Sequence, residues 1–365
     1  MMLTPEEKNR YNRHLILDKV GVKGQEKLKA AKVLVIGAGG LGCSVLQYLT
    51  AAGVGNIGIV DFDLIDESNL QRQILFTVND IGKPKSEIAE KRLKQLNPLV
   101  KFTVFNLRLS PQNAENIFKN FDIIVDGTDN FSTRYLVSDT CVKLNKPLVY
   151  GSIFKFEGQV SVFNYKGGPS YRCLFPSPPK PNSVPSCSEI GVIGVLPGII
   201  GTQQANETLK IILGFGDPLS GKLLIYNALT TEYLTINILK NHKEVDKITA
   251  NTFIIAEQDY DEFCEIKQNQ SSKKSIDFTT FKTCLNQPDY LIIDVREAWE
   301  QPQLSASNLL QIPLDEIDDR LDEIPKDLPV IFICQTGGRS ANVIDFLIAN
   351  YDYTNLINLE GGIKS

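Results

Sequence analysis

The chain has 365 residues, enough for two domains, and a formal net charge of −5, which argues against a general nucleic-acid binder because phosphate-backbone affinity comes from clustered lysines and arginines. Its N-terminus has no apolar signal segment, and its longest apolar stretch, residues 191–201, is too short to cross a membrane, so we expect a cytoplasmic protein. The seven cysteines are scattered and odd in number, which does not indicate a disulfide framework.

The first predicted element is a helix. Thr4 is a typical N-cap, Pro5 suits the first helical position, and Glu7 completes a capping-box pattern, so we expect a helix from Pro5 through residue 15. Arg10 and Arg13 lie one turn apart on it. From composition alone, the two arginines are interpreted as a solvated basic edge.

A glycine-rich segment follows. Residues 33–36 are a short apolar run that predicts a buried strand, residues 41–52 look helical, and Gly37, Gly39 and Gly42 between them fit G-x-G-x-x-G. A second apolar run, residues 57–60, ends at Asp61, where dinucleotide-binding folds place a ribose-binding acid. The pattern suits NAD, FAD or ATP almost equally, and a plain strand–helix turn is the alternative.

Cationic and polar residues after Asp61 favour a triphosphate and its metal over a nicotinamide. The helical spacing of residues 83–96 places Lys85 in a first turn, although a surface lysine is the alternative. Further strands are predicted at residues 102–105 and 123–125, and the second of these ends in DGTDN. Asp126 and Asp129 therefore lie at a strand's carboxyl end, where open parallel sheets bind ligands, unless they only cap a turn. Beyond a strand at 148–150 the period shifts toward two, which predicts antiparallel strands.

The motifs GAGGLG, DFD, SNLQRQ, GKPK and DGTDN, in this order over residues 5–240, resemble the ubiquitin-activating-like sulfur-carrier adenylyltransferases of the MoeB/ThiF group. The resemblance implies an α/β fold: a Rossmann-like ATP-binding domain with a mixed, mainly parallel sheet, in a homodimer that uses ATP and Mg²⁺. It also implies that Asp129, ahead of Asp126, helps to hold Mg²⁺, and that Arg13 reaches the partner subunit's nucleotide. The nucleotide-binding residues that it implies are Gly37, Gly39, Gly40, Gly42, Asp61, Asp63, Ser68, Asn69, Arg72, Gln73, Lys85, Asp129 and Asn130.

Residues 167–189 are rich in proline and predict a long loop that ends near Cys187. By resemblance Cys187 matches a sulfur-handling cysteine, while an inert thiol is the alternative. Family members commonly carry two C-x-x-C pairs for structural zinc. Here the first pair falls on Ser170 and Cys173, and no cysteine stands near residues 241–247, so we expect no structural zinc.

We interpret residues 1–240 as the adenylyltransferase domain and residues 241–275 as a linker in which 252–264 pack as a short strand and helix. Residues 276–365 predict a second, smaller α/β domain with strands ending at Asp294 and Cys334, an amphipathic segment at 314–324, and a helix beginning near Arg339. Backbone N–H groups curled around the Cys334 sulfur, beside an arginine, would stabilise a thiolate or persulfide. A buried strand-end cysteine is the alternative.

CQTGGRS, DVRE and LEGG resemble the rhodanese family, which implies a persulfide on Cys334 in a loop with Gly337, Gly338 and Arg339. Together the two halves imply ATP-dependent activation of a ubiquitin-like sulfur carrier ending in Gly-Gly. Sulfur transfer to a thiocarboxylate would follow, for molybdopterin or thiamin synthesis, with a cysteine desulfurase or another sulfane donor upstream. An NAD(P)- or FAD-dependent oxidoreductase and a non-catalytic binder of a ubiquitin-like protein are the alternatives. The catalytic residues implied are Arg13, Arg72, Lys85, Asp129, Cys187 and Cys334.

Overall fold

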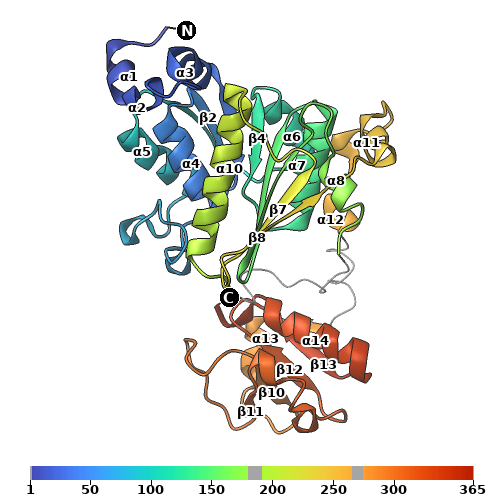
Figure 1. Ribbon diagram of the computed structural model, residues 1–365. Helices are drawn as coiled ribbons and strands as arrows, with labels where there is room; N and C mark the ends of the chain where they lie inside the picture. Colours follow the sequence, from blue (N-terminus) through green and yellow to red (C-terminus); the bar gives the residue numbers. More distant parts are fainter. Residues whose placement is uncertain (1, 180–190, 265–273, 365) are drawn as a thin grey trace. The chain divides into compact units, whose positions relative to one another are not determined.

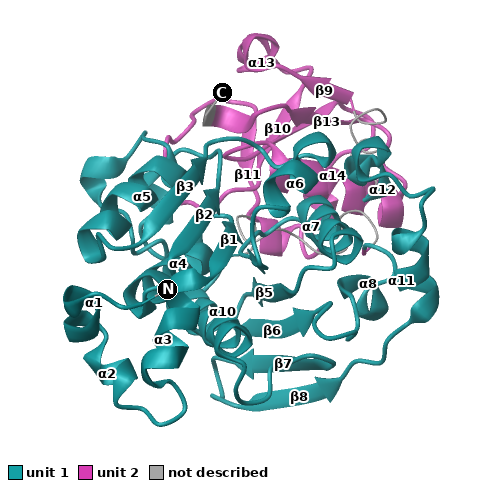
Figure 2. Ribbon diagram, turned by 90° about the horizontal axis from the view of Figure 1, so that it is seen from above, with its two compact units in different colours: residues 1–178, 186–264 teal, residues 179–185, 265–365 magenta. Residues whose placement is uncertain are grey.

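The computed structural model describes residues 2–179, 191–264 and 274–364. The chain forms two compact units (Figure 2). Unit 1 comprises residues 1–178 and 186–264, and unit 2 comprises residues 179–185 and 265–365. Among the described residues, no helix is both long and apolar enough to span a membrane.

Unit 1 is built on an eight-stranded sheet with the order β3-β2-β1-β4-β5-β6-β7-β8. The first five strands in this order run parallel, and β6, β7 and β8 are added antiparallel, so the predicted mixed, mainly parallel sheet is confirmed. The strands are β1 (Lys32–Ile36), β2 (Asn56–Val60), β3 (Lys101–Phe105), β4 (Ile123–Asp126), β5 (Leu148–Phe154), β6 (Glu157–Phe163), β7 (Lys222–Asn227) and β8 (Tyr233–Asn237).

Apolar residues on both faces of the central strands explain why helices cover both faces of this sheet. In β1, Val33 and Val35 belong to one buried cluster, whereas Leu34 and Ile36 belong to another. A strand buried on both faces is typical of a parallel sheet between helical layers. Helix α10 runs along one face beside α4 (Figure 1). The helices of unit 1 are α1 (Pro5–Arg10), α2 (Asn12–Leu15), α3 (Gly21–Ala30), α4 (Gly40–Ala52), α5 (Lys85–Leu96), α6 (Pro111–Phe118), α7 (Phe131–Lys143), α8 (Tyr171–Leu174), α10 (Val195–Leu213), α11 (His242–Thr249) and α12 (Tyr260–Phe263).

The N-terminal helix is shorter than predicted. The capping box of Thr4 and Glu7 is present, but the helix breaks at Tyr11, and α2 follows as a separate turn. Tyr11 is buried, its hydroxyl accepts a hydrogen bond of 2.8 Å from Asn97 Nδ2, and its ring lies against Gly53. This tertiary anchor overrides the local helical pattern.

Two further segments differ from their predictions. Tyr171–Leu174 form the short helix α8 inside the predicted loop, and residues 252–264 contain a 3-10 turn, η3 (Ile255–Glu257), and α12 but no strand. Ile248, Ile255 and Tyr260 are buried in unit 1. Because buried apolar side chains anchor residues 242–264, this part of the predicted linker belongs to unit 1.

Unit 2 is a five-stranded sheet with the order β11-β10-β12-β13-β9, in which all described pairings are parallel. The amphipathic segment 314–324 forms two 3-10 turns, η5 (Leu314–Glu316) and η6 (Leu321–Glu323), not one helix. The other elements are β9 (Lys274–Ile276), α13 (Phe278–Cys284), β10 (Leu291–Asp294), β11 (Leu309–Gln311), β12 (Val330–Ile333), α14 (Gly338–Tyr351), β13 (Leu356–Leu359) and η7 (Gly362–Lys364).

Candidate functional site

The candidate site of unit 1 lies where the strand order changes direction, because β1 has β2 on one side and β4 on the other. The segments that follow these strands meet at one edge. Gly37 N donates to Val60 O at 2.8 Å, and Gly127 N donates to Ile36 O at 2.8 Å. In open parallel sheets, ligands bind at this kind of switch point.

Two positions here require glycine, one in the turn after β1 and one in the first turn of α4. Gly37 has a φ of +89°, and a Cβ placed on Gly42 would lie 1.9 Å from Gly37 O. Helix α4 begins at Gly40, with Gly39 as its N-cap. The close packing of turn and helix points the helix N-terminus at whatever binds over the turn, which suits a phosphate.

Asp61 joins this turn to the segment after β2. Its Oδ2 accepts from Ala38 N at 2.7 Å, and its Oδ1 accepts from Asp63 N at 2.9 Å. Burial raises the pKa of Asp61, while the Ala38 bond and the charge of Lys85 act in the opposite direction. The predicted ribose-binding acid therefore also shapes the site, because it fixes two loops through backbone donors.

Lys85 is brought to the same edge and is paired there. It is the first residue of α5, as predicted, and its Nζ lies 2.8 Å from Asp63 Oδ2. The lysine side chain is 8% exposed, whereas that of Asp63 is 50% exposed. A phosphate bound at this edge would therefore share the Lys85 ammonium group with the Asp63 carboxylate.

The SNLQRQ motif lies over the start of α4. The Cβ position of Gly40 is 3.6 Å from Arg72 Cγ, and that of Gly39 is 3.7 Å from Gln73 Nε2. Arg72 donates to the Ser68 carbonyl at 3.1 Å, and Gln73 N donates to the Asn69 carbonyl at 2.9 Å. The buried Oε1 of Gln73 has no hydrogen-bond partner among the described residues.

The segment after β4 carries one exposed and one buried carboxylate. Asp126 is 1% exposed and accepts from Thr128 N at 2.9 Å and from Thr128 Oγ1 at 2.7 Å. Burial raises the pKa of Asp126, which the charge of Arg134 opposes. Asp129 is exposed, and Asn130 caps α7 by accepting from Thr133 N. Asp129 is thus the carboxylate of the two that solvent reaches, and its preference over Asp126 as an Mg²⁺ ligand stays a prediction.

Sequence reasoning missed Arg134. Its guanidinium is buried, donates to the Thr128 carbonyl at 3.0 Å, and lies over the rings of Phe131 and Tyr150 at 5.7 Å each. It therefore supports the turn that carries Asp129. The available signal was its position at the fourth residue of α7, one turn after the N-cap Asn130.

The structure does not place two further predicted residues at this site. Arg13 is exposed on α2, and no described hydrogen bond or ion pair connects it to the glycine turn of its own chain. Cys187 lies outside the described residues. Their predicted roles stay predictions.

Cys173, the cysteine of the incomplete first C-x-x-C pair, takes part in hydrogen bonds. Cys173 Sγ lies 3.3 Å from Ser170 N and 3.2 Å from Asn241 N. No cluster of three or more His, Cys, Asp or Glu side chains that could hold a metal occurs in residues 2–179, 191–264 and 274–364. The absence of zinc stays a prediction, which metal analysis of protein purified without chelator would test.

The candidate site of unit 2 is the turn between β12 and α14. Cys334 follows β12 and is fully buried, and its Sγ accepts from Gly337 N at 3.1 Å and lies 3.3 Å from Ser340 Oγ. Gly337 has a φ of +86° and is the N-cap of α14, which begins at Gly338. A sulfur atom that lies at a helix N-terminus and accepts a backbone N–H is a site for a thiolate or persulfide.

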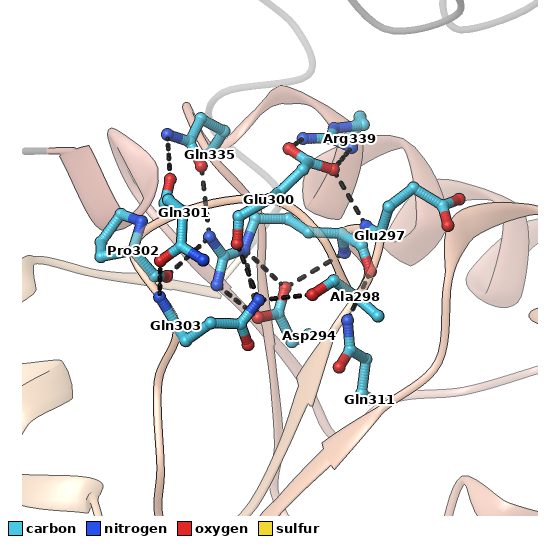
Figure 3. Close-up of polar contacts among 11 residues, drawn as sticks. Asp294, Glu297, Ala298, Glu300, Gln301, Pro302, Gln303, Gln311, Gln335 and Arg339 are labelled. Atoms are coloured by element: carbon cyan, nitrogen blue, oxygen red, sulfur yellow. Dashed lines mark hydrogen bonds and ion pairs between the residues drawn. The ribbon is translucent and has the colours of Figure 1, made fainter.

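Carboxylates and amides from the segment after β10 surround this turn (Figure 3). Arg339 donates to both carboxylate oxygens of Glu300, at 2.6 and 2.5 Å. Arg296, which is 1% exposed, donates to Asp294 and, through Nη1, to Gln335 Oε1 at 3.2 Å. Glu300 and the role of Arg296 were missed from the sequence, although Arg296 lies in the DVRE motif and Glu300 follows it closely.

Comparisons with known proteins agree with this geometry. The model of the ThiF family matches residues 11–247, and that of the rhodanese-like domain matches residues 277–365. The chain is 42% identical to the probable adenylyltransferase/sulfurtransferase MoeZ of Mycobacterium tuberculosis over 99% of this chain and 93% of the relative. It is 49% identical to a sulfur carrier protein adenylyltransferase of Thermus thermophilus over 73% of this chain and the whole relative.

A third relative, the adenylyltransferase and sulfurtransferase MOCS3 of Drosophila sechellia, is 38% identical over the whole of this chain and 83% of its own length. The fold of unit 1 also resembles the crystal structure of Escherichia coli MccB with ATP, with a TM-score of 0.57 and 23% identity over 65% of this chain and 73% of that one. The chain therefore belongs to the ThiF family, as a MoeB/ThiF-type adenylyltransferase with a C-terminal rhodanese domain.

Proposed function

We propose that the protein uses ATP to adenylylate the C-terminal glycine of a ubiquitin-like sulfur carrier and then delivers sulfur from Cys334 to the activated acyl group. The observation that carries this proposal is the presence of two complementary sites in one chain. One is an anion-binding site at the switch point of unit 1, and the other is the turn before α14, in which Gly337 N donates to the sulfur of Cys334. The named activities of the full-length relatives support the same pairing of steps.

The first step needs positioning more than proton transfer. A carrier carboxylate is already ionised at neutral pH and attacks the α-phosphate of ATP, with pyrophosphate leaving. The N-terminus of α4, Arg72 and Lys85 would bind the phosphates, and the Gln73 amide would contact the nucleotide. The rate then comes from charge stabilisation and orientation.

Asp129 would hold Mg²⁺ together with the phosphates, which fits an exposed carboxylate beside an anion site, because proteins often bind Mg²⁺ through one or two carboxylates plus substrate phosphates. The bound ion would offset phosphate charge. We further propose that the protein is a homodimer in which Arg13 of each subunit reaches the nucleotide of the other. Exposure of Arg13 on α2 is compatible with such a role.

In the second step the outer sulfur of a Cys334 persulfide attacks the acyl carbon, and AMP leaves. The carrier is then held as an acyl disulfide, and a second thiol must attack the Cys334 sulfur to release the thiocarboxylate. We propose that a dithiol reductant supplies this thiol, and that Cys187 forms an acyl or disulfide link with the carrier during release. The sulfur would come from a cysteine desulfurase or another sulfane donor, and the product would serve molybdopterin or thiamin synthesis.

The test is ATP–pyrophosphate exchange with Mg²⁺ and each candidate carrier ending in Gly-Gly, followed by mass analysis of the carrier. Exchange should require one carrier and disappear in Asp129→Ala. Cys334→Ala should keep exchange and lose thiocarboxylate formation, whereas Cys284→Ala, a matched buried thiol of unit 2, should keep both. Equal loss of both steps in Cys334→Ala would contradict the division of labour, and no exchange with any carrier would point to a binding-only unit 1.

A further inference from the structure

The arginine of the persulfide turn is held by a carboxylate from outside that turn. Arg339 and Glu300 form a two-pronged pair, and their side chains are only 17% and 13% exposed. Figure 3 shows the Glu300 carboxylate facing the Arg339 guanidinium. Paired bonds of this kind fix the plane of the guanidinium and are stronger than bonds between neutral groups.

Glu300 is itself fixed in place. Its Oε1 also accepts from Glu297 N at 2.9 Å, and its backbone carbonyl accepts from Gln303 Nε2 at 2.9 Å. The segment is anchored further by Arg296, whose Nη1 donates to the Pro302 carbonyl at 3.0 Å. The pair is therefore a built feature of the turn's surroundings, because several independent bonds hold the carboxylate where it meets Arg339.

The pair sets the charge beside the sulfur. Arg339 is the second residue of α14, whose N-cap Gly337 donates to Cys334 Sγ at 3.1 Å, so the arginine belongs to the same helix start as the sulfur. The Glu300 bond raises the pKa of Arg339. The second arginine, Arg296, is likewise matched by Asp294 at 2.7 Å. Both guanidinium charges at this turn are thus offset by carboxylates of the same unit.

We propose that Glu300 is a specificity-determining residue for the sulfur donor, which rests on the proposed persulfide on Cys334. By occupying Arg339, Glu300 denies small anionic donors the cation that they would need next to the sulfur. Donors that dock through a larger surface, such as a protein persulfide, do not depend on that cation. The structure therefore assigns Glu300 to discrimination against small anions, not to the transfer step itself.

Thiosulfate is a suitable probe because its chemistry at the turn is simple. The Cys334 thiolate attacks the outer sulfur, the sulfur–sulfur bond of thiosulfate breaks, and sulfite leaves with the electron pair, so that a cysteine persulfide forms. Cyanide then removes the outer sulfur as thiocyanate and restores the thiolate. Benzenethiosulfonate reacts in the same way with benzenesulfinate as the leaving group, but it carries one negative charge where thiosulfate carries two.

The experiment measures KM for both donors in the full chain at low and high ionic strength. Glu300→Gln keeps the shape and one acceptor while it removes the charge, so KM for thiosulfate should fall about tenfold or more at low salt. The fall should be smaller for benzenethiosulfonate, and both should shrink at high salt. Glu323→Gln is the matched control. Glu323 lies in η6 and pairs with Arg320, so this variant removes the same charge from a different ion pair of unit 2, and it should leave both KM values within about twofold.

A double variant separates charge from structural damage. Glu300→Gln with Arg339→Gln is uncharged at this position, like the wild-type pair as a whole, so its KM for thiosulfate should return to within about twofold of the wild type. An unchanged KM in Glu300→Gln, or a change that is equal for both donors and independent of salt, would overturn the role of Glu300. If intact mass shows no added sulfur on the wild type or any variant with either donor, the proposed function of Cys334 fails instead.

Discussion

Replacing Gly42 with alanine should damage the nucleotide site through a steric conflict that the structure quantifies. The new Cβ would lie 1.9 Å from Gly37 O, whereas ordinary contacts begin near 3.4 Å, so α4 or the turn must move by roughly 1.5 Å. Overpacking of this kind costs about 1–3 kcal/mol or more, and the better helix propensity of alanine returns about 1 kcal/mol of that. Because the 1.9 Å contact is severe, we expect the upper end of this range, a net loss of about 2 kcal/mol or more in the stability of unit 1.

The displaced groups are the N–H donors proposed to bind phosphate, so ATP affinity should fall about tenfold or more. Calorimetric unfolding and titration with ATP measure the two effects. Gly198→Ala is the matched control, because Gly198 lies in α10 and its Cβ would be no closer than 3.9 Å to Ser44 Oγ. It should be neutral or stabilising by up to about 1 kcal/mol. The reasoning is refuted if the two variants behave alike.

Two predictions concern ion pairs. Asp139→Asn breaks a pair in which Arg172 donates at 2.7 and 2.8 Å, with both side chains buried. Unit 1 should therefore lose about 3 kcal/mol or more of stability in urea unfolding. As the control, Asp261→Asn removes a carboxylate from the exposed pair with Arg108 and should cost less than about 1 kcal/mol. Burial acts to raise the pKa of Glu300 and the Arg339 bond to lower it, with a net lowering. Because the pKa is lower in the folded state, the unfolded state binds more protons than the folded state as pH falls below about 4.5. The extra stability of the wild type over Glu300→Gln, measured in melting curves of unit 2, should therefore be full above that pH. It should be lost as pH falls through the lower pKa of the folded state. A difference that grows on acidification would reverse the sign of this argument.

The elements around the nucleotide turn follow from sequence because their signals are local. Residues 33–36 and 57–60 are apolar runs that precede glycine or aspartate, and β1 and β2 end at the same residues, each beginning one residue earlier. The glycine spacing also predicts α4, since Gly42 must pack on Gly37. Lys85 at the start of α5 follows from the helical period of its neighbours.

The contacts that the sequence did not predict join residues far apart in the chain. Arg339 meets Glu300 across 39 positions, and Tyr11 meets Asn97 across 86, so no period or turn motif contains either pair. Tyr11 also shows how one such contact can end a helix that its capping box begins. Segment 314–324 has helical spacing, but its turns are set by packing of Ile317 and Ile324 into the core of unit 2.

The Lys85–Asp63 pair raises a question that the resemblance alone leaves open, namely whether Asp63 binds the nucleotide or only balances the lysine. If it is a counter-charge, Asp63→Asn should free the ammonium group for phosphate, and KM for ATP in the exchange assay should fall about threefold or more at low salt. If Asp63 binds the nucleotide, KM should rise. Glu87→Gln, which removes a charge from the first turn of the same helix, is the control and should change little. The 2.8 Å ion pair favours the counter-charge, because the Asp63 carboxylate already neutralises the buried ammonium group of Lys85.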